Sequence, residues 1–240
     1  MELHVAFLPE EVGPVRGRTI VVIDVIRATT SVLAMLERGC AEVLIAPEVE
    51  AARRYREAHP QVLLAGEQGG VAPPGFDFGN SPPAFAGADL AGRRVVFATT
   101  NGTRAIRLTR EASVVLLGCL RNRSAAAREA VAAAEGPGIT LVCAGREGRF
   151  SLDDAYTAGA IVDAAVAIPS AHGPIDLTDA ARAAHALYQS NADAAMVFRQ
   201  TRAGQNVIAI DLPGDLDYCA EQDRSVLVPR LGERVRVVAP

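Results

Sequence analysis

Short apolar runs alternate with amphipathic stretches over most of the chain, and this alternation limits the possible folds more than any other feature. The apolar runs are rich in Val, Ile and Leu, and several are apolar at consecutive positions, as strands buried on both faces are. The expected strands are Leu3–Leu8, Thr19–Val25, Glu42–Ala46, Val62–Ala65, Arg93–Ala98, Ser113–Gly118, Ile139–Cys143, Ser225–Val228 and, at a sheet edge, Arg234–Val238.

The stretches between these runs have helical periodicity, and Gly39 and Gly136 stand where helix C-caps are expected. The expected helices are Thr29–Arg38, Glu48–Ala58, Thr103–Glu111 and Ser124–Ala134, followed by an Ala-rich helical region from Asp153 to about Gln200. This alternation predicts an α/β fold, a three-layer α/β/α sandwich with a mainly parallel or mixed central sheet. No repeat or linker divides the sequence, so we expect a single domain over residues 1–240.

The composition argues against several classes of protein. The net charge of −4 is unlike the basic excess of nucleic-acid-binding proteins. Every basic residue is Arg, which excludes Schiff-base chemistry and a P-loop Lys. The four cysteines form no CxxC pair, which favours buried free thiols over a zinc site. Without a signal-peptide pattern or a long apolar run, we expect a cytoplasmic protein with no membrane partner.

Polar residues follow five of the expected strands. They lie within Asp24–Arg27, Gly66–Glu67, Thr99–Thr103, Gly118–Asn122 and Cys143–Arg149. In open parallel sheets ligands bind beyond the carboxyl ends of the strands, and in a parallel sheet all five groups would meet at that edge. The convergence predicts a site for a small, polar molecule.

The segment Thr99–Thr103 joins a strand to a helix and is made of small hydroxyl residues, Asn101 and Gly102. Such a segment lets the backbone approach an anion, and a helix N-terminus offers free N–H groups to it. The segment could equally be an ordinary N-cap, for which Thr and Asn are common. Its sequence alone leaves both interpretations open.

Asp24, Glu67 and Asp154 could together supply the carboxylates that Mg²⁺ binds alongside waters and phosphate oxygens. Each has an alternative role. Asp24 could pair with Arg27, Glu67 could be an exposed loop residue, and Asp154 could serve the first turn of a helix.

Asn80 and Ser81 offer an amide and a hydroxyl before a proline, where an unremarkable Asx-turn is the alternative. Cys143 and Arg149 have the C-x5-R spacing of cysteine phosphatases. Against that mechanism, Phe150 follows the Arg, and the acidic Glu147 would repel a phosphate dianion.

The chain resembles the 2-phosphosulfolactate phosphatase family in five ordered blocks spread from about Val5 to Val228. The blocks are Val22–Thr30, Gly79–Pro82, Thr99–Thr103, Cys143–Gly145 with Phe150–Asp154, and Asp215–Ala220. Two departures occur: Asp153 stands where Glu is expected, and Thr201–Ile210 matches only loosely.

The resemblance implies a Mg²⁺-dependent acid phosphatase with a three-layer α/β/α fold that converts 2-phosphosulfolactate to sulfolactate and phosphate, a step toward coenzyme M. The ligand would be a small anionic phosphate ester, and the strand-like C-terminal tail could extend a sheet across a homodimer. A cysteine phosphatase and a non-catalytic protein that binds small anions are the alternatives.

Residue chemistry and the resemblance together suggest roles for individual residues. We expect Asp24, Arg27 and Asn101 to act in catalysis. The expected metal ligands are Asp24, Glu67 and Asp154. The expected substrate-binding residues are Asn80, Ser81, Thr99, Thr100, Gly102, Thr103 and Arg121.

Overall fold

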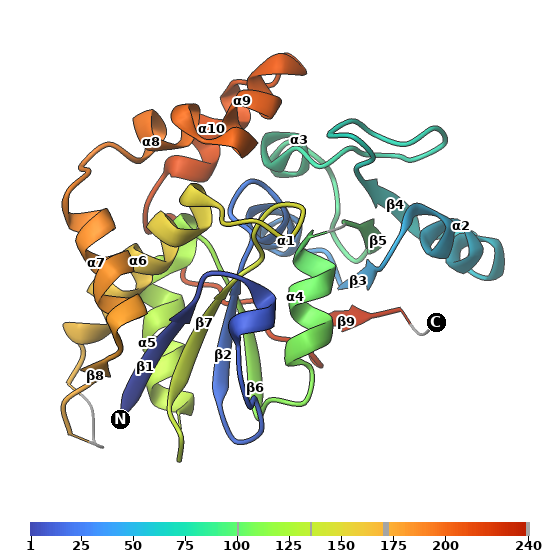
Figure 1. Ribbon diagram of the computed structural model, residues 1–240. Helices are drawn as coiled ribbons and strands as arrows, with labels where there is room; N and C mark the ends of the chain where they lie inside the picture. Colours follow the sequence, from blue (N-terminus) through green and yellow to red (C-terminus); the bar gives the residue numbers. More distant parts are fainter. Residues whose placement is uncertain (100, 135, 170–172, 239–240) are drawn as a thin grey trace.

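The computed structural model describes residues 1–99, 101–134, 136–169 and 173–238, in which helices flank two β-sheets (Figure 1). Within these ranges the larger sheet has five strands in the order β6-β2-β7-β1-β8, and the smaller has four in the order β4-β5-β3-β9. The larger sheet contains β1 (Glu2–Ala6), β2 (Thr19–Ile23), β6 (Val114–Gly118), β7 (Ile139–Cys143) and β8 (Asp176–Leu177). The smaller contains β3 (Glu42–Ala46), β4 (Leu63–Gly66), β5 (Arg94–Ala98) and β9 (Val235–Val237). Neighbouring strands in both sheets run parallel, and the predicted α/β class is confirmed.

Helix α1 (Ala28–Glu37) lies between the two sheets and is buried from Ala28 to Leu36. A helix buried all round needs apolar partners on every side. Val22 of β2, Ile45 of β3 and Val32 of α1 accordingly belong to one buried cluster. This shared core explains how the strands can divide into two sheets instead of forming one.

The remaining helices cover the outer faces and the carboxyl ends of the strands (Figure 1). They are α2 (Val49–Ala58), α3 (Pro82–Ala86), α4 (Asn101–Thr109), α5 (Arg123–Ala133), α6 (Leu152–Val166), α7 (Asp179–Gln189), α8 (Ala194–Gln200), α9 (Arg202–Ala209) and α10 (Gly214–Ala220), with short 3₁₀ turns at Pro9–Glu11 and Leu120–Asn122. Helices α8, α9 and α10 gather above the strand ends at the top of Figure 1.

The two expected C-terminal strands have different outcomes. The strand predicted at Arg234–Val238 is confirmed as β9, which pairs with β3 at the edge of the smaller sheet. The strand predicted at Ser225–Val228 is wrong, because that segment is irregular. Its backbone makes separate contacts, with the N–H of Ser225 donating to the Arg121 carbonyl (2.9 Å) and the Leu227 carbonyl accepting from Asn122 (3.1 Å). These contacts hold the segment without a strand ladder.

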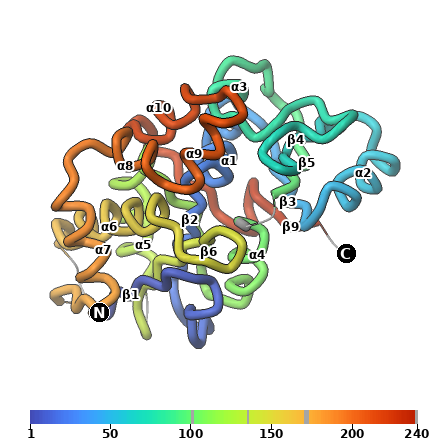
Figure 2. Tube along the Cα trace, turned by 45° about the horizontal axis from the view of Figure 1, so that its top comes forward, coloured from blue at the N-terminus to red at the C-terminus, as the bar shows by residue number. Residues whose placement is uncertain are grey.

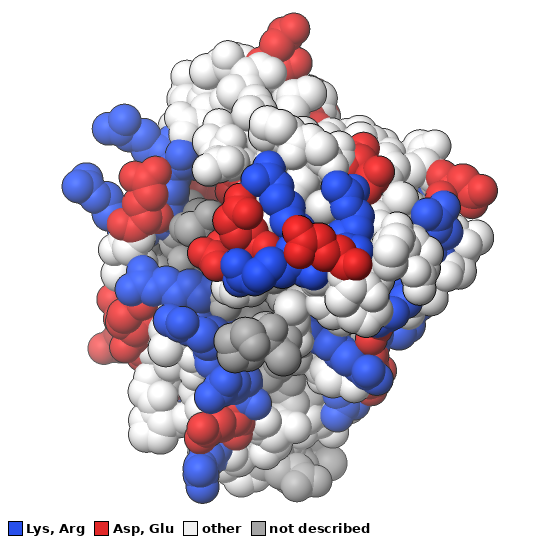
Figure 3. All heavy atoms as spheres, turned by 90° about the vertical axis from the view of Figure 1, so that its right-hand side faces the viewer, with Lys and Arg blue, Asp and Glu red and all other residues white. Residues whose placement is uncertain are grey.

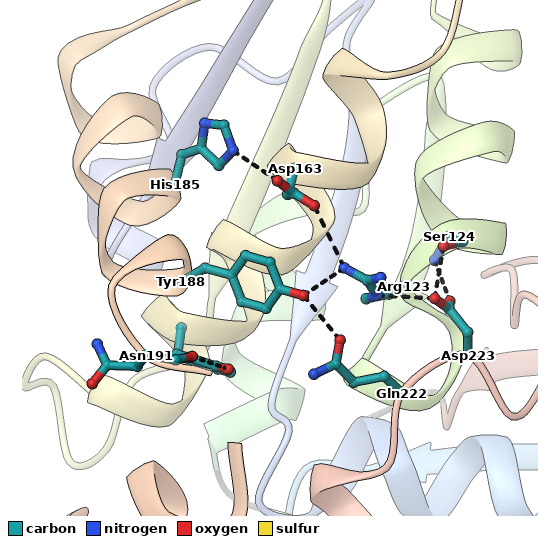
Figure 4. Close-up of polar contacts among 9 residues, drawn as sticks. Arg123, Ser124, Asp163, His185, Tyr188, Asn191, Gln222 and Asp223 are labelled. Atoms are coloured by element: carbon teal, nitrogen blue, oxygen red, sulfur yellow. Dashed lines mark hydrogen bonds and ion pairs between the residues drawn. The ribbon is translucent and has the colours of Figure 1, made fainter. Parts of the chain in front are cut away.

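A mixed-charge cluster joins α5, α6, α7 and the chain after α10 (Figure 4). We call it the Arg123 cluster; its members include Arg123, Asp163, His185 and Asp223. The Arg123 guanidinium lies 2.9 Å from Asp223 and 3.7 Å from Asp163, and it donates a hydrogen bond to the Tyr188 hydroxyl (2.8 Å). His185 lies 3.0 Å from Asp163. The cluster therefore ties distant parts of the chain together with opposite charges.

The surface charges, the helices and the cysteines of the described residues can be compared with what the composition led us to expect. On the face seen in Figure 3, basic and acidic side chains are interspersed. None of the helices in the described ranges combines the length and apolar composition of a membrane span. All four cysteines are buried and free, in agreement with the free thiols expected from the sequence.

Candidate active site

A cavity of about 440 Å³ lies at the carboxyl ends of strands from both sheets. This volume suits a small organic ligand. One wall consists of residues that follow strands: Asp24, Arg27, Glu67, Gly70 and Thr99. The other wall contains Arg146 and Glu147 after β7, together with Ala203, Asn206, Val207 and Ile210 from α9 and its end. Figure 2 turns this edge toward the viewer, with α9 lying over it.

Asp24 follows β2 and accepts hydrogen bonds from the first residues of α1. The N–H of Ala28 donates to its carboxylate (3.4 Å), and the N–H of Thr29 donates to its backbone carbonyl (2.9 Å). The residue is buried but lines the cavity. Burial, with smaller contributions from the charges of Asp153 and Glu67, raises the pKa of Asp24 from 3.8 to about 6.

Two more carboxylates lie behind Asp24, and we call Asp24, Asp153 and Asp154 the acidic cluster. Asp154 accepts hydrogen bonds from the N–H groups of Val25 (3.0 Å) and Gly145 (3.1 Å), so it links the chain beyond β2 to the chain beyond β7. Burial raises the pKa of both Asp153 and Asp154, and the neighbouring acidic charges raise that of Asp154 further. Three buried carboxyl groups are therefore held close together.

The cavity arginines form ion pairs with acids outside this cluster. Arg27 pairs with Asp215 of α10 at 2.7 Å, with both side chains almost fully buried, and not with Asp24. Arg146 pairs with Glu147 at 3.7 Å. None of the ion pairs of the described residues involves the acidic cluster, although the charge of Arg146 acts to lower the pKa of Asp153. A buried carboxylate in that state is costly and marks a candidate functional site.

Asp215 was missed by the sequence reasoning, although it lies in a block of the resemblance. Its second carboxylate oxygen accepts a hydrogen bond from the Ser81 hydroxyl (2.7 Å), while Arg27 also donates to the Gly70 carbonyl (2.8 Å). Arg27 is therefore held in the cavity wall by Asp215 and the Gly70 carbonyl, and Ser81 in turn holds Asp215. Asn80 lines the cavity and accepts a hydrogen bond from the Ser31 hydroxyl (2.7 Å).

The expected anion loop is described in part. Thr99 lines the cavity, and a Cβ added to Gly102 would lie 3.1 Å from an Asp24 carboxylate oxygen. The Thr103 hydroxyl donates to the carbonyl of Thr99, within the segment itself. Thr100 and the side chain of Asn101 lie outside the described residues. Phosphate binding by the loop stays a prediction.

Two other expected residues have different surroundings. The Arg121 guanidinium lies over the Tyr218 ring (3.8 Å) and pairs with Glu221, and it is not among the described residues that line the cavity. Cys143 is fully buried, and burial raises the pKa of its thiol well above the ordinary value, whereas Arg149 is exposed. A nucleophilic thiolate needs the opposite shift, so this geometry argues against a Cys143–Arg149 phosphatase.

The donor set on the cavity wall is compatible with Mg²⁺. Asp24 and Glu67 line the same cavity, and Glu67 is fixed by the Gly70 N–H (2.7 Å). Mg²⁺ is commonly bound by one or two carboxylates, with waters and substrate phosphate oxygens completing its shell. In the described ranges no group of three or more His, Cys, Asp or Glu has the geometry of an all-protein metal site. Asp154, whose two oxygens accept backbone N–H groups, is not a described cavity-lining residue.

Comparison with known proteins finds a close match along the chain. A family model described as 2-phosphosulpholactate phosphatase matches residues 7–234. A protein from Deinococcus radiodurans is 43% identical over 232 residues, which cover 96% of this chain and 93% of that protein. One from Thermus thermophilus is 40% identical over 90% of this chain and 89% of its own length. One from Clostridium acetobutylicum is 33% identical over 90% of each. All three are named probable 2-phosphosulfolactate phosphatases.

Proposed function

The chain belongs to the 2-phosphosulfolactate phosphatase family, and from this premise we propose that it is a Mg²⁺-dependent phosphoric monoester hydrolase. Its substrate is 2-phosphosulfolactate or a closely related acidic phosphate ester. The observation that carries the proposal is the cavity wall, where Asp24 and Glu67, two carboxylates that take part in no ion pair of the described residues, lie with Arg27 at the ends of parallel strands. This combination suits a ligand that arrives as a metal–phosphate complex.

In this proposal Asp24 and Glu67 hold the metal, while Asp154 positions the backbone around Asp24. Mg²⁺ supplies charge neutralisation of the phosphate and orientation of the reacting groups in sites of this kind. Asp24 is itself placed to act as a nucleophile, and an acyl-phosphate route predicts that a phosphoenzyme can be trapped on it. A water nucleophile predicts that none can.

The remaining residues of the wall orient the substrate. Arg27 keeps a fixed direction because Asp215 and the Gly70 carbonyl hold its guanidinium. Thr99 lines the same cavity as Asp24 and provides a hydroxyl for phosphate oxygens. Arg121 has its own partners and is left out of the proposed site.

The proposal is tested by phosphate release from a panel that includes 2-phosphosulfolactate and 2-phospholactate, with Mg²⁺ and with EDTA. We expect Mg²⁺-dependent release, fastest with 2-phosphosulfolactate. Release that persists in EDTA but disappears in Cys143→Ser would support the cysteine mechanism. Anion binding without turnover on the whole panel would make the protein a non-catalytic binder. The coenzyme M route, the cytoplasmic location and the homodimer stay predictions.

A further inference from the structure

A tight turn after β7 carries two arginines in different surroundings. The N–H of Arg146 donates to the Arg149 carbonyl (2.9 Å), and the N–H of Arg149 donates to the Arg146 carbonyl (2.8 Å). The two residues between them, Glu147 and Gly148, have φ values of 52° and 72°. Positive φ at both central residues is typical of a two-residue type I′ hairpin turn. The turn places Arg146 on the cavity wall and leaves Arg149 exposed.

Helix α9 holds Arg146 from the other side. With the Asn206 amide oriented so that its oxygen faces the guanidinium, that oxygen accepts hydrogen bonds from both terminal nitrogens of Arg146, one of them at 3.3 Å. The end of α9 also reaches the strand-end wall, since a Cβ on Gly70 would lie 3.3 Å from the Ile210 side chain. The hydrogen-bonded pair Arg146–Asn206 is therefore part of the cavity wall.

Of the described residues that line the cavity, two are cationic, and they differ in how their charge is compensated. Arg27 has the buried Asp215 carboxylate at 2.7 Å. Arg146 has the Glu147 carboxylate at 3.7 Å, and the Glu147 side chain is 78% exposed, so solvent weakens that interaction. Asn206 is neutral, and the more distant Asp153 carboxylate attracts the Arg146 charge without forming an ion pair among those of the described residues. Unlike Arg27, Arg146 therefore has no buried carboxylate among these ion-pair partners, and its guanidinium stays available to a ligand.

We propose that Arg146, oriented by Asn206, is the specificity-determining cation that binds the sulfonate of the substrate. The inference rests on the proposed function and names a subsite within it. The phosphate lies against Asp24, Glu67 and Thr99, and the sulfonate, one carbon further from the ester than the carboxylate, reaches the wall formed by the β7 turn and α9. A guanidinium suits this role because its planar fork can donate two hydrogen bonds to one anionic group.

The experiment compares Arg146→Gln with Arg149→Gln, a matched control at the other end of the same turn. The substrates are 2-phosphosulfolactate and 2-phospholactate, which lacks the sulfonate. For Arg146→Gln we expect kcat/KM on 2-phosphosulfolactate to fall roughly 10- to 100-fold, mainly through KM, as for the loss of a hydrogen bond to a charged group. On 2-phospholactate the kcat/KM of Arg146→Gln should change by less than about threefold. Arg149→Gln should leave kcat/KM unchanged on both substrates.

If Arg146→Gln fails to fold, Asn206→Ala provides a second variant. Its kcat/KM should also fall selectively on 2-phosphosulfolactate, but by a smaller factor. Equal losses on the two substrates, or no loss on 2-phosphosulfolactate, would overturn the assignment while leaving the proposed phosphatase intact. A wild-type protein that releases phosphate from no ester of the panel would overturn the proposed function and this subsite with it.

Discussion

The acidic cluster and the Arg123 cluster are two polar groups built on opposite principles. In the Arg123 cluster, Asp163 and Asp223 lie beside the oppositely charged Arg123, and Asp163 also contacts His185 (Figure 4). In the acidic cluster, three carboxylates are buried together, and burial raises the pKa of each. The first arrangement joins helices, whereas the second costs stability. A fold tolerates such a cost where the charge has a function, and here the charge borders a cavity.

Replacing Asp24 should have the largest effect on activity. Asp24→Asn keeps the shape of the side chain but removes the charge that we propose binds the metal or attacks the phosphate. We expect kcat to fall by about 10³-fold or more. Phosphate release from 2-phosphosulfolactate under saturating Mg²⁺ measures it. A variant within tenfold of the wild type would remove Asp24 from the chemistry.

Asp215→Asn should have the largest effect on folding. It leaves the buried Arg27 charge without its ion-pair partner, and breaking a buried pair in this way costs about 3 kcal/mol of unfolding free energy or more. Urea denaturation measures the loss. An unfolding free energy equal to that of the wild type would show that the Gly70 carbonyl and solvent suffice for Arg27.

The raised pKa of Asp24 also predicts that the Asp24→Asn variant is more stable than the wild type, by an amount that depends on pH. The pKa of Asp24 is about 6 in the folded protein and 3.8 ordinarily. Between pH 3.8 and 6 the folded state therefore binds more protons than the unfolded state, and the free energy of unfolding of the wild type falls as the pH rises through about 6. In EDTA, Asp24→Asn should therefore match the wild type near pH 4 and exceed it by up to about 3 kcal/mol at pH 7.

Urea denaturation of both proteins at the two pH values tests this expectation. Added Mg²⁺ should stabilise the wild type at pH 7 but not the variant, because a ligand of the folded state shifts the unfolding equilibrium. A variant that is less stable than the wild type at pH 7 in EDTA would contradict the account of the acidic cluster.

The Arg123 cluster should give the smallest effect. Asp223→Asn removes a half-exposed partner of Arg123, and Asp163 and Tyr188 remain in place. We expect less than about 1 kcal/mol of lost stability and unchanged phosphate release. Thermal unfolding and the standard assay provide the check. A loss of activity here would mean that the two clusters are coupled through α6.

The sequence predicted the parts of this molecule that depend on local pattern. Alternation located most strands and helices, and the strand-end rule anticipated that Asp24, Glu67 and Thr99 would meet. The division into two sheets could not be foreseen, because it arises from α1 packing against both. Side-chain pairs between residues far apart in the sequence were also missed, because they depend on tertiary packing.

Three site features illustrate this limit. Asp215 and Asn206 come from short helices late in the chain, and only tertiary packing brings them to Arg27 and Arg146. Arg121 follows a strand, as expected for a site residue, but its guanidinium contacts Tyr218 and Glu221 and does not line the cavity among the described residues. A signal was available for Arg146, since it follows a strand as Asp24 does.

The most direct test of the central claim, that the cavity carboxylates serve a Mg²⁺-dependent phosphatase, is a Mg²⁺ titration of the EDTA-treated protein while phosphate release from 2-phosphosulfolactate is followed. The account predicts no release without added metal, saturable recovery with Mg²⁺, and a large loss of that recovery in Glu67→Gln. Full activity in EDTA, unaffected by Mg²⁺, would contradict it.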